Sequence, residues 1–151
     1  TPTTVHQRVS MDLSIDIGNH IRSKGGKCQV FAAPFAVYPK KNDNRTYVEP
    51  DINVICDPDK LDNKGCHGMP DWVIEIVSPG NAEHDYGRKL NLYQINGVKE
   101  YWIVDPQRSV VLAYVFGDDF KLECYTFKDK VKVNISDDLV LDFAEIISLI
   151  S

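Results

Sequence analysis

Two carboxylates in the middle of the chain are placed where they could bind a metal ion. Glu75 interrupts an otherwise apolar run, DWVIEIVS, at residues 71–78. An ionised carboxylate among apolar neighbours is costly in free energy unless it is paired or bound to a metal. The presence of Glu75 in this run therefore indicates a structural or a catalytic role. Asp51 opens a second apolar run, DINVIC, at residues 51–56. Side chains alternate across a strand, so these two carboxylates could face one hard divalent cation, Mg²⁺ or Mn²⁺, if the strands are neighbours.

A lysine further along the chain could complete such a site. Lys89 lies three residues after Tyr86 and four before Tyr93, which places it at the border of the apolar face of a predicted helix. A lysine that faces a sheet needs an anion. Beside a metal ion it could position a water or stabilise charge on a phosphate oxygen, which suits phosphodiester hydrolysis. Buried Lys–Glu pairs also occur as purely structural devices, so the spacing alone leaves both interpretations open.

The surrounding elements follow from hydrophobic periodicity and turn signals. The order of the predicted helices and strands is typical of an α/β fold, or of α+β if the sheet is mostly antiparallel. The reason is that a helix between the third and fourth predicted strands permits a crossover into a mixed sheet. Residues 57–69 read as a long polar loop. We predict a helix from Val5 to about Ile21, strands at 30–38, 51–56 and 71–78, a helix at 82–96, strands at 100–104, 110–116 and 121–127, and a short last helix that starts at Asp142.

Length and charge restrict the function classes. The 151 residues, 43% hydrophobic and 26% charged, fit one soluble domain that spans residues 1–151. The formal net charge of −5 means that contact with a nucleic acid needs a local basic patch. Lys40, Lys41 and Arg45 share a polar loop and could contact phosphates, although a charged run in a loop is more often only solvated.

The cysteines and the apolar runs favour a cytoplasmic protein. The four cysteines are irregularly spaced and form no C-x-x-C pair, so we expect reduced thiols, with neither a disulfide framework nor a structural zinc site. No apolar run approaches the ~20 residues that span a bilayer, so no membrane segment is expected. Nothing indicates an organic cofactor. The cysteines are Cys28, Cys56, Cys66 and Cys124.

Four ordered motifs carry a resemblance to a known family. They are VEPDI at 48–52, GMPDWVIEIVSP at 68–79, RKLNLY at 88–93 and EYWIVDP at 100–106. Together with P-x-x-x-H-Q at residues 2–7, they resemble the Uma-type restriction endonuclease family of the PD-(D/E)XK nuclease superfamily. The resemblance implies a restriction-endonuclease-like core, with a mixed central sheet flanked by helices and a hairpin-rich C-terminal part. It also implies that the family's N-terminal strands are missing.

The resemblance further implies a metal-dependent endonuclease in which Asp51 and Glu75 bind Mg²⁺ or Mn²⁺ and Lys89 assists the attacking water. The superfamily places its lysine two residues after the glutamate, where this chain has Val77, and Lys89 of the R-K-L-x-x-Y motif fills that role. Asp71 shares a face with Glu75 and is a reserve metal ligand; alternatively it only opens its strand.

The expected partners are DNA, with Arg88 as a further phosphate contact, and a second copy of the chain. A homodimer would supply two sites related by a two-fold axis for the two strands of a duplex. The alternative is a catalytically inactive nuclease-fold module that binds nucleic acid or forms homo-oligomers, which the acidic net charge slightly favours. His6 matches the family pattern, but we expect a capping or packing role for it. We expect His84 to be solvated.

Overall fold

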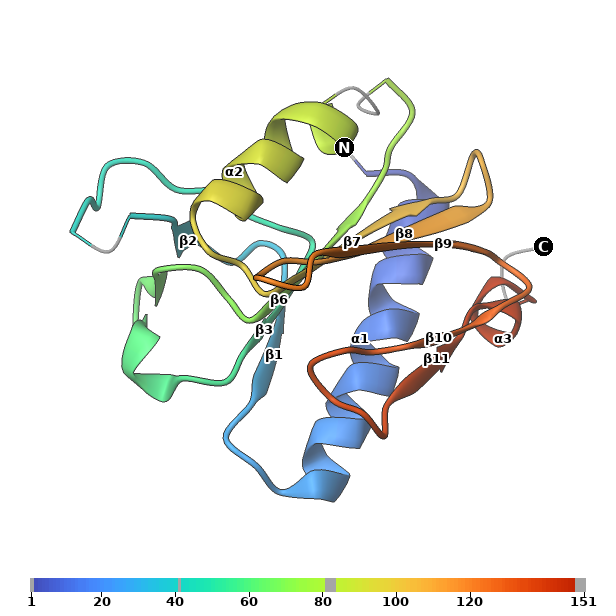
Figure 1. Ribbon diagram of the computed structural model, residues 1–151, viewed down its shortest axis with the longest axis horizontal. Coiled ribbons are helices and arrows are strands. Elements are labelled where there is room, and N and C mark those ends of the chain that lie inside the picture. Colours follow the sequence, from blue (N-terminus) through green and yellow to red (C-terminus); the bar gives the residue numbers. More distant parts are fainter. Residues whose placement is uncertain (1, 41, 81–83, 149–151) are drawn as a thin grey trace.

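A six-stranded mixed sheet forms the centre of the protein, with its strands in the order β1-β3-β6-β7-β8-β9 (Figure 1). The computed structural model describes residues 2–40, 42–80 and 84–148. Strands β6 and β7 are parallel, and the other neighbouring pairs in this sheet are antiparallel. The strands are β1 (Gln29–Ala32), β3 (Ile52–Ile55), β6 (Trp72–Ile76), β7 (Glu100–Asp105), β8 (Val110–Val115) and β9 (Lys121–Thr126).

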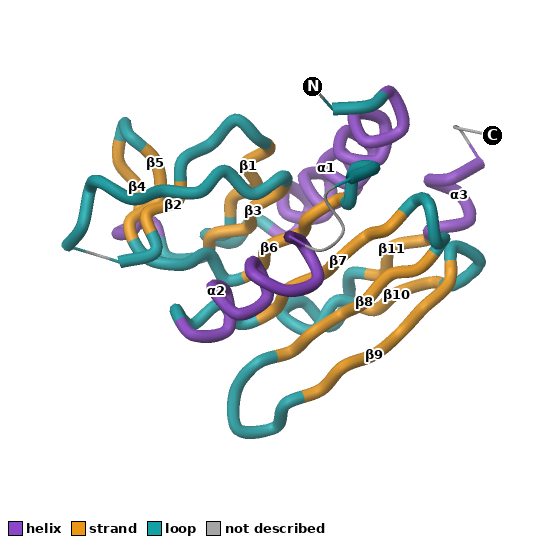
Figure 2. The backbone as a smooth tube through the Cα atoms, turned by 90° about the horizontal axis from the view of Figure 1, so that it is seen from above, coloured by secondary structure: helices purple, strands orange, loops and turns teal. Residues whose placement is uncertain are grey.

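Helices cover both faces of this sheet, which confirms the predicted mixed α/β core. On one face, α1 (Thr4–Lys24) and α3 (Phe143–Ser148) pack around the buried Trp72. On the other face, a π-helical turn, η2 (His84–Lys89), continues into α2 (Leu90–Ile95). Figure 2 shows α1 and α2 on opposite sides of β6 and β7. The segment formed by η2 and α2 is the crossover that makes β6 and β7 parallel, as expected for a helix between two neighbouring strands.

Short strands replace the polar loop that was predicted at 57–69. A 3₁₀ turn leads into β4 and β5, which pair with each other, and β5 also pairs in parallel with β2. The predicted strand at 30–38 is wrong as a single strand, because β1 ends at Ala32 and β2 joins this second sheet. Strands of two or three residues carry too little alternation to be detected in a sequence. The additional elements are η1 (Pro58–Lys60), β2 (Val37–Tyr38), β4 (Leu61–Asp62), β5 (Gly65–His67), and the hairpin β10 (Lys130–Lys132) and β11 (Val140–Asp142).

The expectation of four reduced cysteines is wrong for two of them. Cys28 and Cys56 form a disulfide across 28 residues of sequence. Because Gln29 pairs with Ile55 in the antiparallel β1–β3 ladder, the two cysteines stand directly opposite each other just beyond it. The sequence spacing could not show this, since the pairing depends on strand register. The other two cysteines are free: Cys66 is buried and Cys124 is exposed.

The first helix has clear start and stop signals. The Thr3 side chain accepts a hydrogen bond from the backbone N–H of His6 at 3.1 Å, which caps the N-terminus. Gly25, with a φ of 71°, ends the helix, and its N–H donates to the Ile21 carbonyl. None of the helices in the described ranges is long and apolar enough to cross a membrane.

We predict that Leu13→Ala destabilises the protein by about 2–5 kcal/mol, because Leu13 is fully buried between α1 and the sheet. Urea denaturation followed by circular dichroism measures this loss. Met11→Ala on the same helix is the matched control, since Met11 is 57% exposed, and it should change stability by less than about 0.5 kcal/mol. Equal losses in the two variants would contradict the packing of α1 described here.

Candidate active site

Asp51 and Glu75 meet where β3 and β6 pair. Asn53 pairs with Val73 in the antiparallel ladder, so Asp51, two residues earlier, comes beside Glu75, two residues later. The backbone N–H of Asp51 donates to Glu75 Oε1 at 3.0 Å, and the N–H of Ile76 donates to Asp51 Oδ2 at 2.7 Å. The two predicted ligands are thus neighbours, and each side chain is held by the backbone of the other strand.

Two side chains from the crossover helix converge on the other oxygen of Glu75. Lys89 Nζ lies 2.9 Å from Glu75 Oε2, and the Tyr93 hydroxyl donates to the same oxygen at 2.7 Å. Glu75 is only 1% exposed, whereas the side chain of Lys89 is 27% exposed. The structure therefore brings together the three residues that the sequence predicts for catalysis. The role of Tyr93 was missed, because a tyrosine in an apolar stripe usually only packs in the core.

His6 reaches the same site from α1. Its Nε2 lies 3.1 Å from Asp51 Oδ2, and the residue is 8% exposed. The expected capping and packing role is present, because the backbone N–H takes part in the cap and the residue is buried, and the ring in addition contacts a site carboxylate. The signal that could have found it was its match to the P-x-x-x-H-Q motif.

Burial controls the protonation of Glu75. Removal from water raises the pKa of Glu75 from its usual 4.5 to about 7, and the Asp51 carboxylate adds to the rise, while Lys89 opposes it. Burial beside Glu75 also raises the pKa of Tyr93 far above its usual value, so the hydroxyl stays a hydrogen-bond donor. A cation bound at this place would favour the ionised form of Glu75.

The donor set suits a hard cation. Asp51 and Glu75 supply carboxylate oxygens, the ligands that Mg²⁺ and Mn²⁺ prefer. Within the described residues no hydrogen bond reaches Asp51 Oδ1, and this side chain is 18% exposed. The same residues contain no group of three or more His, Cys, Asp or Glu side chains that could hold a metal. An ion here would complete its shell with water or substrate oxygens, as Mg²⁺ commonly does.

The structure separates the other predicted residues from this pair. Asp71 lies at the opposite end of β6, where it accepts from the Cys56 N–H at 2.6 Å and pairs with Lys99 at 3.2 Å. This placement fits the alternative that Asp71 opens its strand. Lys40 and Arg45 are exposed in the loop between β2 and β3, where Arg45 Nε lies 3.9 Å from Asp43.

Of the remaining predicted contacts, Arg88 is exposed on η2, next in sequence to Lys89. Lys41 and the side chain of His84 lie outside the described residues.

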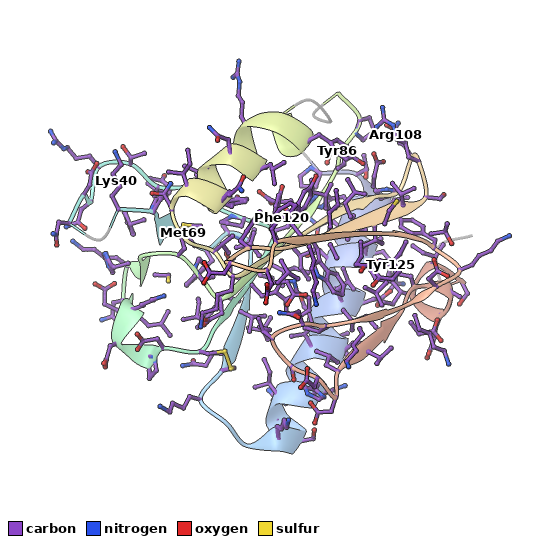
Figure 3. The ribbon with its side chains drawn as sticks, viewed as in Figure 1. Lys40, Met69, Tyr86, Arg108, Phe120 and Tyr125 are labelled. Carbon is purple, nitrogen blue, oxygen red and sulfur yellow. A yellow bond between two sulfur atoms is a disulfide. The ribbon has the colours of Figure 1, made fainter. Side chains whose placement is uncertain are left out.

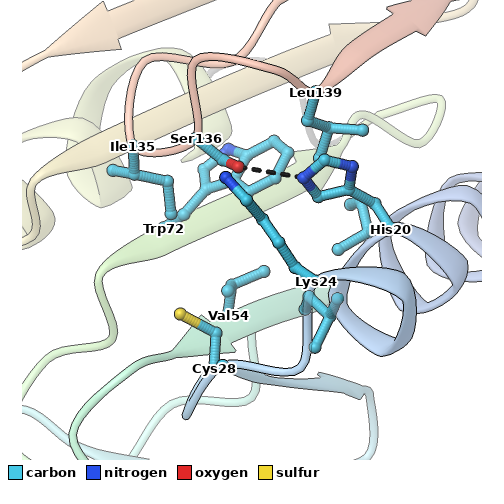
Figure 4. Close-up of a pocket in the computed structure, with 11 residues that line it drawn as sticks. His20, Lys24, Cys28, Val54, Trp72, Ile135, Ser136 and Leu139 are labelled. Atoms are coloured by element: carbon cyan, nitrogen blue, oxygen red, sulfur yellow. Dashed lines mark hydrogen bonds between the residues drawn. The ribbon is translucent and has the colours of Figure 1, made fainter.

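An apolar cavity of about 350 Å³ lies on the other face of the sheet, between α1 and the loop that precedes β11 (Figure 4). Val54 and Trp72 of the sheet line it, together with His20 and Ser136, whose Nε2 and Oγ approach to 3.0 Å. Neither Asp51 nor Glu75 lines it. The carboxylate site, at the start of β3 and the end of β6, is therefore separate from this cavity.

We predict that Glu75 makes stability depend on pH. Its pKa is higher in the folded than in the unfolded state, so its favourable contribution is fully present below about pH 4.5 and is lost as the pH rises through about 7. Glu75→Gln should lack this loss. The free energy of unfolding of Glu75→Gln minus that of wild type should therefore increase over this range in metal-free buffer. Glu123→Gln on β9 controls for the loss of one charge, and a pH-independent difference for Glu75→Gln would contradict the raised pKa.

Comparisons with known proteins agree with this fold and its motifs. A crystal structure described as "a putative nuclease belonging to DUF820", from Anabaena variabilis, superposes with a TM-score of 0.78 over 100% of this chain and 84% of that chain, at 18% identity, which shows a shared fold. The "Uncharacterized protein slr1290" of Synechocystis sp. is 29% identical over 115 residues, which are 76% of this chain and 58% of the relative's length. The model of the Uma2 family, described as "Putative restriction endonuclease", matches residues 1–144, so the chain belongs to the Uma2 family.

Proposed function

We propose that this protein is an endonuclease, dependent on Mg²⁺ or Mn²⁺, that hydrolyses phosphodiester bonds in DNA. The observation that carries the proposal is the buried Glu75 carboxylate, which shares one end of the sheet with Asp51 and contacts Lys89. The Uma2 family description and the fold of the Anabaena protein support the nuclease class.

Asp51 and Glu75 would hold the metal ion. The ion would supply positive charge that acidifies a water and stabilises the phosphate during attack. Tyr93 favours the ionised form of Glu75, because its hydroxyl donates to Oε2. His6 acts as a positioning residue, because its ring nitrogen and the Ile76 N–H both contact Asp51 Oδ2 and so orient this carboxylate.

Lys89 would act on the substrate side of the carboxylates. Its ammonium group is partly exposed and already stands beside Glu75 Oε2. From there it could orient the attacking water by a hydrogen bond and stabilise the negative charge that develops on a phosphate oxygen. Two copies of the chain would be the simplest arrangement for cutting both strands of a duplex.

We expect Asp51→Asn to weaken binding of Mg²⁺ and Mn²⁺ in calorimetry and to reduce nicking of plasmid DNA by about 100-fold or more, equivalent to about 2.7 kcal/mol of barrier. Lys89→Ala should reduce nicking while metal binding persists. Asp71→Asn is the matched control, because it removes a carboxylate charge at the far end of β6, the strand that carries Glu75, and it should leave both measurements near wild type. Circular dichroism checks that each variant is folded.

An unchanged metal affinity in Asp51→Asn would contradict the proposed site. Metal binding by wild type without cleavage of duplex or single-stranded DNA or RNA would contradict the proposed activity and support the inactive nucleic-acid-binding module instead.

A further inference from the structure

A second buried carboxylate lies on the same face of the sheet as Glu75, at the end of β7. Asp105 is 0% exposed. Its Oδ1 accepts the backbone N–H groups of Gln107 and Arg108 at 3.0 and 3.1 Å, which closes the turn between β7 and β8. Its Oδ2 accepts the Tyr86 hydroxyl at 2.8 Å and Arg108 Nη1 at 2.9 Å.

This cluster is linked to the proposed catalytic lysine through η2. Glu75 pairs with Ile103 in the parallel β6–β7 ladder, so Asp105, two residues later, projects from the same face. Tyr86 and Lys89 both belong to η2, three residues apart, and each contacts one of the two carboxylates. The same π-helical turn therefore connects Lys89 at the end of β6 with Asp105 at the end of β7.

Arg108 is held in place but remains accessible. Its guanidinium carbon lies 5.8 Å from the centre of the Tyr86 ring, and Figure 3 shows these two side chains beside each other at the edge of the molecule. The Arg108 side chain is nevertheless 61% exposed. A guanidinium has five N–H donors in a planar fork, and Asp105 accepts one of them here. The turn itself is already closed by two backbone N–H groups on Asp105 Oδ1, so it does not require the guanidinium.

We propose that Arg108, positioned by Asp105 and Tyr86, binds a backbone phosphate of the nucleic acid next to the Asp51–Glu75–Lys89 site. This inference rests on the proposed nuclease function and assigns the contact that places the substrate. A planar guanidinium matches a phosphate group in bidentate geometry, and its fixed position reduces the entropy lost on binding. On a chain with a net charge of −5, the exposed Arg88, next in sequence to Lys89, adds a positive charge on η2, and Arg108 keeps N–H donors that its pairing with Asp105 does not use.

The test is binding of a fluorescently labelled 20-base-pair DNA duplex, measured by anisotropy in EDTA so that no cleavage occurs, over a series of salt concentrations. We expect Arg108→Gln to raise the Kd about 10-fold and to reduce the slope of log K against log salt by roughly one phosphate contact. Arg108→Lys should keep the slope and recover part of the affinity. Arg22→Gln is the matched control: Arg22 is exposed in the last turn of α1, about 24 Å from His6 at 1.5 Å per residue.

Further readouts separate substrate binding from a structural role. Arg108→Gln should raise KM more than it lowers kcat in the plasmid assay and should leave Mg²⁺ affinity unchanged. Tyr86→Phe, which keeps the ring but removes the hydroxyl bond to Asp105, should weaken DNA binding by a smaller factor.

Three outcomes would overturn the inference. If Arg108→Gln matches wild type in Kd and salt slope while wild type binds and cuts DNA, the phosphate contact is wrong and the nuclease function stands. If Arg108→Gln lowers the thermal midpoint but leaves the salt slope unchanged, Arg108 only supports the turn. If wild type binds neither DNA nor RNA, the inference fails together with the proposed function. Wild type that binds DNA without cutting it, with the slope reduced in Arg108→Gln, would support the phosphate contact and reject only the catalysis.

Discussion

The Glu75 carboxylate in the interior is the constraint on which the arrangement of this protein depends. A charge there must be compensated by several partners, and the fold supplies them from two separate parts of the chain. The backbone of Asp51 comes from the neighbouring strand, and Lys89 and Tyr93 come from the crossover helix. The parallel β6–β7 connection is what brings that helix over Glu75. Fold and site therefore have a common cause, because the same crossover that joins two strands also covers the buried charge.

The sequence predicts those features of the site that follow from local periodicity. Glu75 stands out as a charge in an apolar run, alternation fixes the face of Asp51, and the helical spacing directs Lys89 toward the sheet. Asp71 shows the limit of this reasoning. It shares a face with Glu75, but four residues of strand separate them, roughly 13 Å at the rise of an extended chain. Sharing a face is thus not the same as sharing a site.

The features that were missed depend on contacts between distant segments. His6 meets Asp51 only because α1 crosses the sheet with its N-terminal end near β3. The Cys28–Cys56 bridge follows from the register of β1 on β3, and β5 exists because β2 lies beside it. None of these pairings leaves a periodic signal in the sequence. The fold class, the long first helix and the four inner strands of the sheet do leave one, and they were predicted correctly.

The disulfide between β1 and β3 has a consequence for the strand that carries Asp51. It closes a loop of 28 residues, which lowers the entropy of the unfolded chain and, in the chain-entropy view, stabilises the folded state by about 3–4 kcal/mol. Strand β3 is then anchored at both ends, covalently at Cys56 and, at its start, through the hydrogen bonds of Asp51 with the Glu75 side chain and the Ile76 N–H. In a reducing environment one of these anchors is lost. The redox state of the surroundings would then set how firmly one wall of the candidate metal site is held.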